Sequence, residues 1–266
     1  MGDDRPILHP AVWPGKINVT RHAPGPELAP FVAYHWVVRW DLDAPYTQRV
    51  LTTPHVHLAI QRDTSWVWGV HTGTTTHPLR GEGFVWGVRF RAGAFRPFLD
   101  GPVSSLTNRT VGLDVIFGVD PAEIEAKVAR EVDGSGPAPT VERMLIDALP
   151  AADPMVEEVG EIVAKVAADP AITRVATLAS VAGVGTRTLQ RLFHEYVGAG
   201  PKWVIRQYRL LEAAGRIAGG GVAGWADLAA QLGYSDQAHL IRDFTAAVGA
   251  PPARYAQTGG RGNGAP

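Results

Sequence analysis

The feature that most constrains the fold of this chain is an internal repeat in its C-terminal third. The segment Leu178–Thr186 resembles the segment Leu228–Asp236, and each contains a Leu-Ala pair with a glycine five residues after the leucine. A Leu-x-x-x-Phe pair follows each segment, at positions 189 and 193 and again at 240 and 244. Self-similarity of this kind indicates one supersecondary unit used twice.

Each copy has the pattern of a helix-turn-helix, which is two helices joined by a short turn that contains glycine. Gly183 and Gly233 fall where the first helix ends and where a positive φ is often needed. Thr186 in the first copy, and Ser235 or Asp236 in the second, are the expected capping residues of the following helix. The sequence therefore predicts two helical hairpins.

The second helix of each hairpin is amphipathic, with its Leu-x-x-x-Phe pair facing inward. The outward positions are Arg187, Thr188, Gln190 and Arg191 in the first copy and Gln237, Ala238, His239 and Arg242 in the second. Arg and Gln can bond bidentately to guanine and adenine edges in the major groove. A single copy could equally be an ordinary hairpin with a solvated polar face, but two copies with outward Arg and Gln favour double-stranded DNA as the partner.

A single long helix is expected between the two hairpins, over Pro201–Ala218. Proline is favoured in the first turn of a helix, and Trp203, Val204, Tyr208 and Leu211 supply apolar faces. Such a connector would fix the separation of the two outward helices. Successive major-groove faces on one side of B-DNA lie about 34 Å apart, so one chain could reach two of them.

The segment 171–256 resembles the C-terminal domain of the AraC family of bacterial transcription regulators. The matching stretches are Gly233–Phe244 with Gly249 and Pro251–Tyr255, and Leu189–Phe193 with Gly198 and Pro201. The resemblance implies a sequence-specific DNA-binding regulator with RNA polymerase as a further candidate partner.

The same resemblance assigns base-reading positions to both outward helices. They are Arg187, Gln190 and Arg191 in the first and Gln237, Ala238, His239 and Arg242 in the second. Because Ala238 has no polar group, we expect the second unit to read fewer bases and to contact phosphate more. The first unit would then supply most of the specificity, as is usual in the family.

Residues 28–118 are rich in short aromatic and β-branched runs separated by Gly, Pro and Thr clusters. The runs Tyr34–Trp40, Ser65–His71 and Phe84–Phe90 alternate as antiparallel strands do, which predicts a barrel or sandwich. The stretches Gly87–Phe98 and Pro102–Leu106 look like the N-terminal effector domain of a large subgroup of the AraC family. That resemblance implies a cupin-like barrel controlled by a small-molecule effector.

The expected fold class is α+β with four segments along the chain. They are a β-rich sensor domain at 1–118, a helical linker at 119–168 that could support a homodimer, a double helix-turn-helix domain at 169–256, and a disordered Gly-rich tail at 257–266. Helices are expected at about 120–132, 140–149 and 154–168, because prolines and acidic caps open them and Gly-Pro or Asp-Pro clusters separate them.

Four tryptophans on the proposed strands are candidate ligand contacts, namely Trp36, Trp66, Trp68 and Trp86. Strand alternation puts aromatic residues on one face and His35, Arg39, His71 and Arg89 on the other. If the aromatic face curls inward, it makes an apolar cavity for a flat or greasy molecule. The alternative is that these rings simply fill the core.

The pair His55 and His57 points the same way on a strand and invites comparison with a cupin metal site. Gln61 stands about where such a site has a glutamate, and only His71 or His77 could complete the ligand set. Neither a phosphate-binding loop nor a nucleophile with a base is evident, and there is no cysteine. We therefore expect no metal, no cofactor and no enzymatic activity. A cupin-like metal-binding or enzymatic module fused to a DNA-binding domain is the alternative.

The net charge of −1 conceals an asymmetry along the chain. From Ala171 onward there are ten Lys and Arg against five Asp and Glu, a balance of +5, so the first 170 residues carry −6. This distribution favours a polyanion as partner of the C-terminal part. The acidic, Pro-broken N-terminus, the absence of cysteine and the lack of a long apolar run lead us to expect a cytoplasmic protein without membrane contact.

Overall fold

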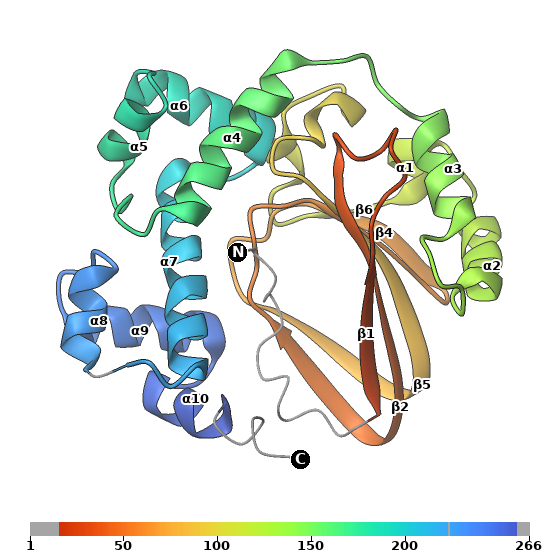
Figure 1. Cartoon of the computed structure of the whole chain (residues 1–266). Coiled ribbons are helices and arrows are strands. Elements are labelled where there is room, and N and C mark those ends of the chain that lie inside the picture. The colour runs from red at the N-terminus through yellow and green to blue at the C-terminus, as the bar shows by residue number, and fades with distance from the viewer. Residues whose placement is uncertain (1–15, 223, 260–266) are drawn as a thin grey trace.

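The computed structural model describes residues 16–222 and 224–259, so expectations about residues 1–15 and 260–266 lie outside it. It combines a six-stranded sheet with a helical part (Figure 1). The strands are β1 Ile17–His22, β2 Val32–Val50, β3 His57–Gln61, β4 Thr64–Trp68, β5 Thr75–Phe90 and β6 Thr110–Gly112. They pair antiparallel in the order β1-β2-β5-β3-β4-β6. The α+β class with an antiparallel N-terminal sheet is confirmed.

The helices follow the sheet along the chain. They are α1 Leu113–Phe117, α2 Pro121–Glu131, α3 Pro139–Asp147, α4 Pro154–Ala168, α5 Val175–Val181, α6 Thr186–Leu192, α7 Pro201–Ala218, α8 Trp225–Gln231, α9 Gln237–Val248 and α10 Pro252–Gly259. Two 3₁₀ segments, η2 Arg96–Phe98 and η3 Val103–Leu106, and a π-helical segment, η4 Phe193–Val197, complete the order. None of the described helices is long and apolar enough to cross a bilayer.

The sheet has two edges, β1 and β6, so closure into a cupin-like barrel is not confirmed. Directly opposed residues of an antiparallel pair share a face. Because Trp36 opposes Gly87 and Val37 opposes Trp86, Trp36 and Trp86 lie on opposite faces of the sheet. The indole of Trp36 occupies the space that a Cβ on residue 87 would need.

One face of the sheet carries the main hydrophobic core. Trp86 is fully buried there with Val37, Leu58 and Val67. The helices α2 and α3 cover this face, and their apolar residues belong to the same core cluster: Ile124, Val128, Val141, Met144 and Leu145. Figure 1 shows both helices against the sheet, away from α5–α10.

A buried polar contact fixes α3 to the sheet. His35 is completely buried, and its Nε2 lies 2.8 Å from Oε1 of Glu142 on α3. The same carboxylate accepts hydrogen bonds from the backbone N–H of Gly25. Burial lowers the pKa of His35. Interpreting 119–168 as one linker was therefore wrong, because its first two helices pack on the sheet.

The helix α4 belongs to a different cluster from α2 and α3. Val159, Ile162, Val163 and Val166 are buried against residues of α5, α6 and α7. The buried Arg209 of α7 donates a hydrogen bond to the carbonyl of Val166 in the last turn of α4. A boundary at residue 169 would thus cut through a hydrophobic cluster.

The last described helix, α10, extends into the first three residues of the segment expected to be disordered, whose remaining residues, 260–266, lie outside the described part of the chain. Gln257 to Gly259 lie in α10, not in a disordered segment. Tyr255 of this helix is buried against Phe244 of α9, with ring centroids 5.4 Å apart. Burial of this aromatic ring stabilises α10. The Gly-rich sequence that follows suggested disorder and gave no sign of the helix.

Candidate nucleic-acid interface

The two repeated hairpins are α5 with α6 and α8 with α9. Their turns are alike, because Gly183 has φ 68° and Gly233 has φ 75°. The residue after each glycine donates a backbone hydrogen bond to an equivalent alanine carbonyl: Val184 N to Ala179 O at 3.0 Å, and Tyr234 N to Ala229 O at 2.9 Å. The expected left-handed glycines are confirmed, and this turn fixes the angle between the helices of each unit.

Each unit has its own hydrophobic cluster. Leu189 and Phe193 are fully buried in one, and Leu240 and Phe244 are fully buried in the other. Leu192 of α6 and Val248 of α9 are buried as well, so the inward face of each helix is apolar and its opposite face is turned outward. In Figure 1 the first unit lies above the second at the left of the molecule, and α7 runs between them.

The outward face of α6 is fully solvated. Arg187, Thr188, Gln190 and Arg191 are all exposed. The prediction that Thr186 is the N-cap of α6 is wrong, because Gly185 is the N-cap and Thr186 is the first residue of the helix. The exposed row joins two guanidinium groups to an amide, which suits hydrogen bonding to base edges and phosphates.

The outward face of α9 is less available than that of α6. Gln237, Ala238 and Arg242 are exposed, but His239 is only half-exposed. Its Nδ1 lies 3.1 Å from Ser235 Oγ and its Nε2 lies 3.7 Å from the Asp243 carboxylate. His239 is thus tied to its own hairpin.

The capping of α9 confirms one of the two expected residues. The side chain of Asp236 accepts a hydrogen bond from the backbone N–H of His239 at 2.7 Å. This bond lowers the pKa of the Asp236 carboxyl. Its negative charge lies at the positive end of the helix dipole, where it stabilises the start of α9.

The first outward helix has an irregular end that periodicity did not reveal. After Leu192 the chain continues as the π-helix η4, which ends at Gly198 with φ 83°. The C-cap of α9 is Gly249, also with φ 83°. Proline follows three residues later in both copies, at the start of α7 and of α10. The repeat therefore includes the helix that follows each hairpin.

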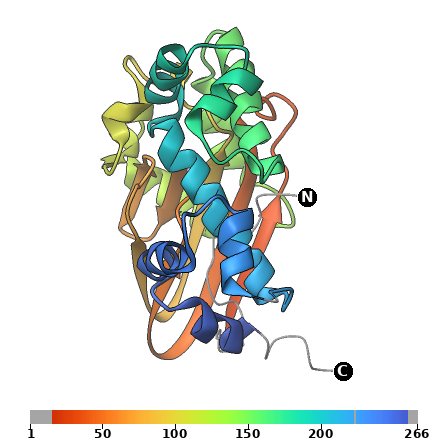
Figure 2. The same ribbon diagram turned by 90° about the vertical axis from the view of Figure 1, so that its left-hand side faces the viewer.

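The connector α7 has the bounds expected from the sequence, Pro201–Ala218. We call the six strands, together with the segments η2, η3 and α1–α3 that pack in their hydrophobic core, the sheet domain. The connector runs along the side of this domain (Figure 2). Trp203 Nε1 donates to the carbonyl of Thr72 at 3.2 Å, and Gln207 Nε2 donates to the carbonyl of Thr52 at 2.6 Å. The connector is therefore bound by two loops of the sheet domain as well as by both hairpins.

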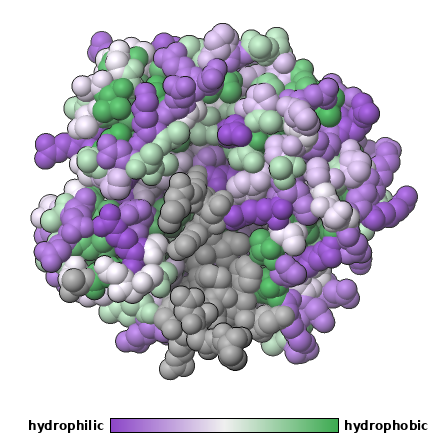
Figure 3. Space-filling model, viewed as in Figure 1, coloured by the Kyte–Doolittle hydropathy of each residue, from purple (hydrophilic) through white to green (hydrophobic). Residues whose placement is uncertain are grey.

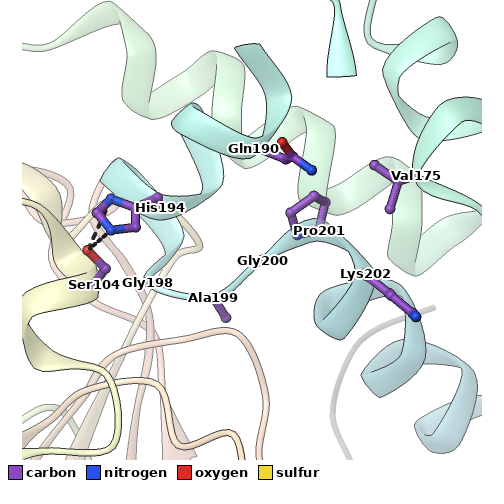
Figure 4. A pocket seen from close by; sticks show the side chains of 9 residues that line it. All are labelled: Ser104, Val175, Gln190, His194, Gly198, Ala199, Gly200, Pro201 and Lys202. Carbon is purple, nitrogen blue, oxygen red and sulfur yellow. Dashed lines mark hydrogen bonds between the residues drawn. The ribbon is translucent and has the colours of Figure 1, made fainter. Parts of the chain in front are cut away.

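A cavity of about 310 Å³ lies where the first hairpin meets the sheet domain (Figure 4). Gln190 and Lys202 line one side, and His194 and Ser104 line the other. Ser104 Oγ is 3.0 Å from His194 Nε2, so a 3₁₀ segment of the sheet domain touches the end of the outward helix. One candidate base-reading side chain thus also borders the contact between domains.

The second face of the sheet carries three of the four candidate ligand-binding tryptophans. Trp66 stacks on Trp68 with ring centroids 5.9 Å apart, and Trp68 stacks on His77 at 4.4 Å. Trp36 meets His57 edge to face at 6.4 Å. We call Trp36, Trp66, Trp68, His57 and His77 the aromatic surface.

Trp86 does not belong to the aromatic surface, so the prediction of one cavity lined by all four tryptophans is wrong. Register between strands decides this, since Trp86 opposes Val37 on the core face. The prediction that Arg89 and His71 lie on the face opposite the tryptophans is also wrong. Arg89 opposes Tyr34 and His57, and the ring of His71 lies 6.3 Å from that of Trp68.

The aromatic surface contains donors without acceptors. Within the described residues, the indole nitrogens of Trp36, Trp66 and Trp68 are buried and have no hydrogen-bond partner. Leaving such a donor unsatisfied costs about 1–3 kcal/mol. Burial lowers the pKa of His57 and of His77 to about 4, so both rings are neutral at pH 7.

The pair His55 and His57 is not part of a larger ligand set. Arg89 Nη2 lies 3.0 Å from the ring nitrogens of His55, and burial lowers the pKa of His55 to about 3 and that of Arg89 to about 10. Residues 16–222 and 224–259 contain no group of three or more His, Cys, Asp or Glu placed to hold a metal ion.

The face seen in Figure 3 shows hydrophobic residues in small patches between hydrophilic ones.

Two family models match the chain. Residues 178–258 match a helix-turn-helix domain. Residues 20–112 match a domain of unknown function, DUF6597. The two matches cover the repeated hairpins and the strands of the sheet, respectively.

Comparison with curated proteins finds no match. Similar solved structures include ToxT from Vibrio cholerae, with 10% identity, 91% of this chain and 98% of that chain covered, and a TM-score of 0.37. ToxT from strain O395 bound to (E)-4-(8-methylnaphthalen-1-yl)but-3-enoic acid has 10% identity, 92% and 99% coverage and a TM-score of 0.35. ToxT bound to an unsaturated fatty acid has 12% identity, 91% and 94% coverage and a TM-score of 0.35.

Proposed function

Because residues 178–258 form a helix-turn-helix domain of the AraC type, we propose that this protein is a transcription regulator that reads duplex DNA with α6 and α9. In this proposal each outward helix enters a major groove, and α7 holds the two helices on one side of the duplex. The observation that carries the proposal is the exposed row of Arg187, Gln190 and Arg191 on α6.

The two units contribute unequally in this proposal. The first presents two arginines and a glutamine from a helix whose apolar face is buried. The second presents Gln237 and Arg242, while His239 is held by Ser235 and Asp243. Base recognition therefore rests mainly on α6, and α9 adds phosphate contacts that increase affinity for any sequence.

The sheet domain is the proposed sensor for a small molecule, bound at the aromatic surface. Stacked rings suit a planar ligand, and unsatisfied indole donors suit a ligand with acceptor oxygens. The neutral histidines add no charge. We infer that the effector is a planar aromatic compound with carbonyl or carboxylate oxygens.

We propose two further partners, RNA polymerase and a second copy of this chain. Contact with RNA polymerase would make the protein an activator. A homodimer would use the solvent-facing sides of α2–α4, since their apolar sides are already buried within the chain. Sedimentation velocity of the full chain, with and without operator DNA, measures the stoichiometry.

The DNA-binding proposal is tested by selecting binding sites from a random duplex library with the full-length protein. Gln190→Ala and Arg191→Ala should each weaken the selected site by about 1–3 kcal/mol and relax base preference at their own positions. Arg130→Ala removes one exposed positive charge from α2 and should leave binding unchanged. Wild-type affinity in both α6 variants, or no enrichment of any sequence, would contradict the proposal.

The sensor proposal is tested by tryptophan fluorescence with acetophenone and benzoate as planar probes. Saturable quenching should accompany a change in DNA affinity, and Trp68→Leu should abolish both effects. Trp86→Phe, on the core face, should preserve them. Quenching that survives Trp68→Leu would place the site elsewhere.

A further inference from the structure

We call the two helix-turn-helix hairpins, α5 with α6 and α8 with α9, the reading units, and their outward helices α6 and α9 the reading helices. The sheet domain contacts both reading units at equivalent points. Gly198 and Gly249 end the two outward helices in the same left-handed conformation, fifty-one residues apart, at φ 83°. Side chains of the sheet domain approach both glycines so closely that a Cβ at either position would meet them.

The first of these contacts is made by the 3₁₀ segments. A Cβ on Gly198 would lie 3.0 Å from the side chain of Val103, and Thr107 Oγ1 donates to the carbonyl of Gly198. Beside this contact, Arg96 pairs with Glu195 of η4 at 2.5 Å. The end of the first reading helix is thus held by backbone, hydroxyl and ionic contacts.

The second contact is made by the end of β2 and the loop before β5. The guanidinium of Arg49 occupies the space beside Gly249, at the negative end of α9, where a cation is favourable. Thr74 Oγ1 donates to the carbonyl of Ala246 in the last turn of α9 at 3.0 Å. Leu51 is buried in the hydrophobic cluster of the second unit.

The two units have separate cores joined through α7. The buried residues of α7 up to Tyr208 belong to the first cluster and those from Leu210 onward to the second, while Leu211 packs against both. Long helices curve gently, so a small bend of α7 alone would change the separation of α6 and α9. The sheet domain contacts the C-terminal ends of both outward helices and also contacts α7. These contacts restrict the movement of one unit relative to the other.

We propose that the sheet domain is a brace that sets the spacing of the two reading helices, so that Arg49, Thr74, Ser104 and Thr107 determine which operator spacing is accepted without touching DNA. This inference rests on the proposed DNA-reading function. One added base pair moves the second half-site by about 3.4 Å and turns it by about 35°. A braced pair of helices tolerates little of either displacement.

The brace is tested first without DNA. The chain has no cysteine, so spin labels can be attached at Thr188→Cys and Ala238→Cys, which are exposed positions on α6 and α9. Electron–electron double resonance should give one narrow distance distribution. In Arg49→Ala/Thr74→Val and in Ser104→Ala/Thr107→Val it should broaden about twofold, because each variant frees one reading unit.

The consequence for recognition is tested with the selected operator and with versions carrying one or two base pairs added or removed between its halves. The braced protein should disfavour each altered spacing by about tenfold or more. Both brace variants should reduce this preference to within about threefold, while their affinity for an isolated first half-site stays unchanged. Arg80→Ala/Thr47→Val, which matches the first brace variant in residue types and lies at exposed positions of β5 and β2, should behave like the wild type.

The outcomes separate the two proposals. Unchanged distance distributions in folded brace variants overturn the brace, and so does an unchanged spacing preference. Broadened distributions in a protein that enriches no DNA sequence keep the brace and refute the DNA-reading function. Circular dichroism melting identifies a variant that has unfolded, and the single changes Thr74→Val and Ser104→Ala then provide the milder test.

Discussion

The helix α4 should be essential for the stability of the DNA-reading part, although it precedes the repeated segment. A fragment of residues 169–266 lacks α4, whereas a fragment of 152–266 retains it. Removing α4 takes Val159, Ile162, Val163 and Val166 away from the cluster, each of which is at most 2% exposed.

The size of the effect follows from the buried area. A fully buried Val or Ile side chain contributes about 1.5–3 kcal/mol, so the four together contribute about 6–12 kcal/mol. Whole domains are stable by only about 5–15 kcal/mol. Two polar contacts are lost as well, from Arg209 to the carbonyl of Val166 and from Tyr196 to Asp153 at 2.8 Å. The first unit of the shorter fragment should therefore be unfolded or nearly so, while the second unit keeps its own cluster.

Urea denaturation followed by circular dichroism measures this difference. The 152–266 fragment should show the full helical signal of both units before urea is added, whereas the 169–266 fragment should lack the signal of the first unit and keep only that of the second, whose cluster contains no α4 residue. Both fragments lack the sheet domain, so the loss of its contacts cancels in the comparison. Within the full chain, Val163→Ala should destabilise and Glu161→Ala, on the exposed side of α4, should not. Equal urea midpoints for the two fragments would refute the reasoning.

Two further predictions concern caps and histidines. Asp236→Ala should cost about 1 kcal/mol of unfolding free energy and Thr186→Ala less than about 0.5 kcal/mol, measured by chemical denaturation, because only Asp236 caps its helix with a side chain. Since burial lowers the pKa of His55, His57 and His77, the unfolded chain binds more protons between about pH 4 and 6.5, and stability should fall on acidification through this window by up to about 1.4 kcal/mol per pH unit for each histidine. Melting temperatures measured from pH 7.5 to 5 give the dependence of stability on pH. The double substitution His57→Gln/His77→Gln should weaken this dependence, and an unchanged dependence would show that other groups cause it.

Local signals explain what the sequence predicted well. Pro201 and the glycines after Ala218 delimit α7, and Gly183 and Gly233 mark the two turns. These features depend on the conformational preferences of single residues, so they can be recognised without knowing the tertiary structure.

Features that depend on distant partners could not be predicted in the same way. Alternation sorts residues within one strand, but only the pairing of Trp36 with Gly87 shows that Trp86 belongs to the other face. The assignment of α4 to the first hairpin depends on packing against residues farther along the chain.

The contact between Trp36 and Gly87 also has a consequence for related sequences. Because the indole fills the space of the missing side chain, any residue larger than glycine at 87 requires a smaller residue at 36. Gly87→Ala should therefore be rescued by Trp36→Leu, and the two positions should change together as sequences diverge. Such paired changes would fix the alignment of β2 with β5 in relatives known only by sequence.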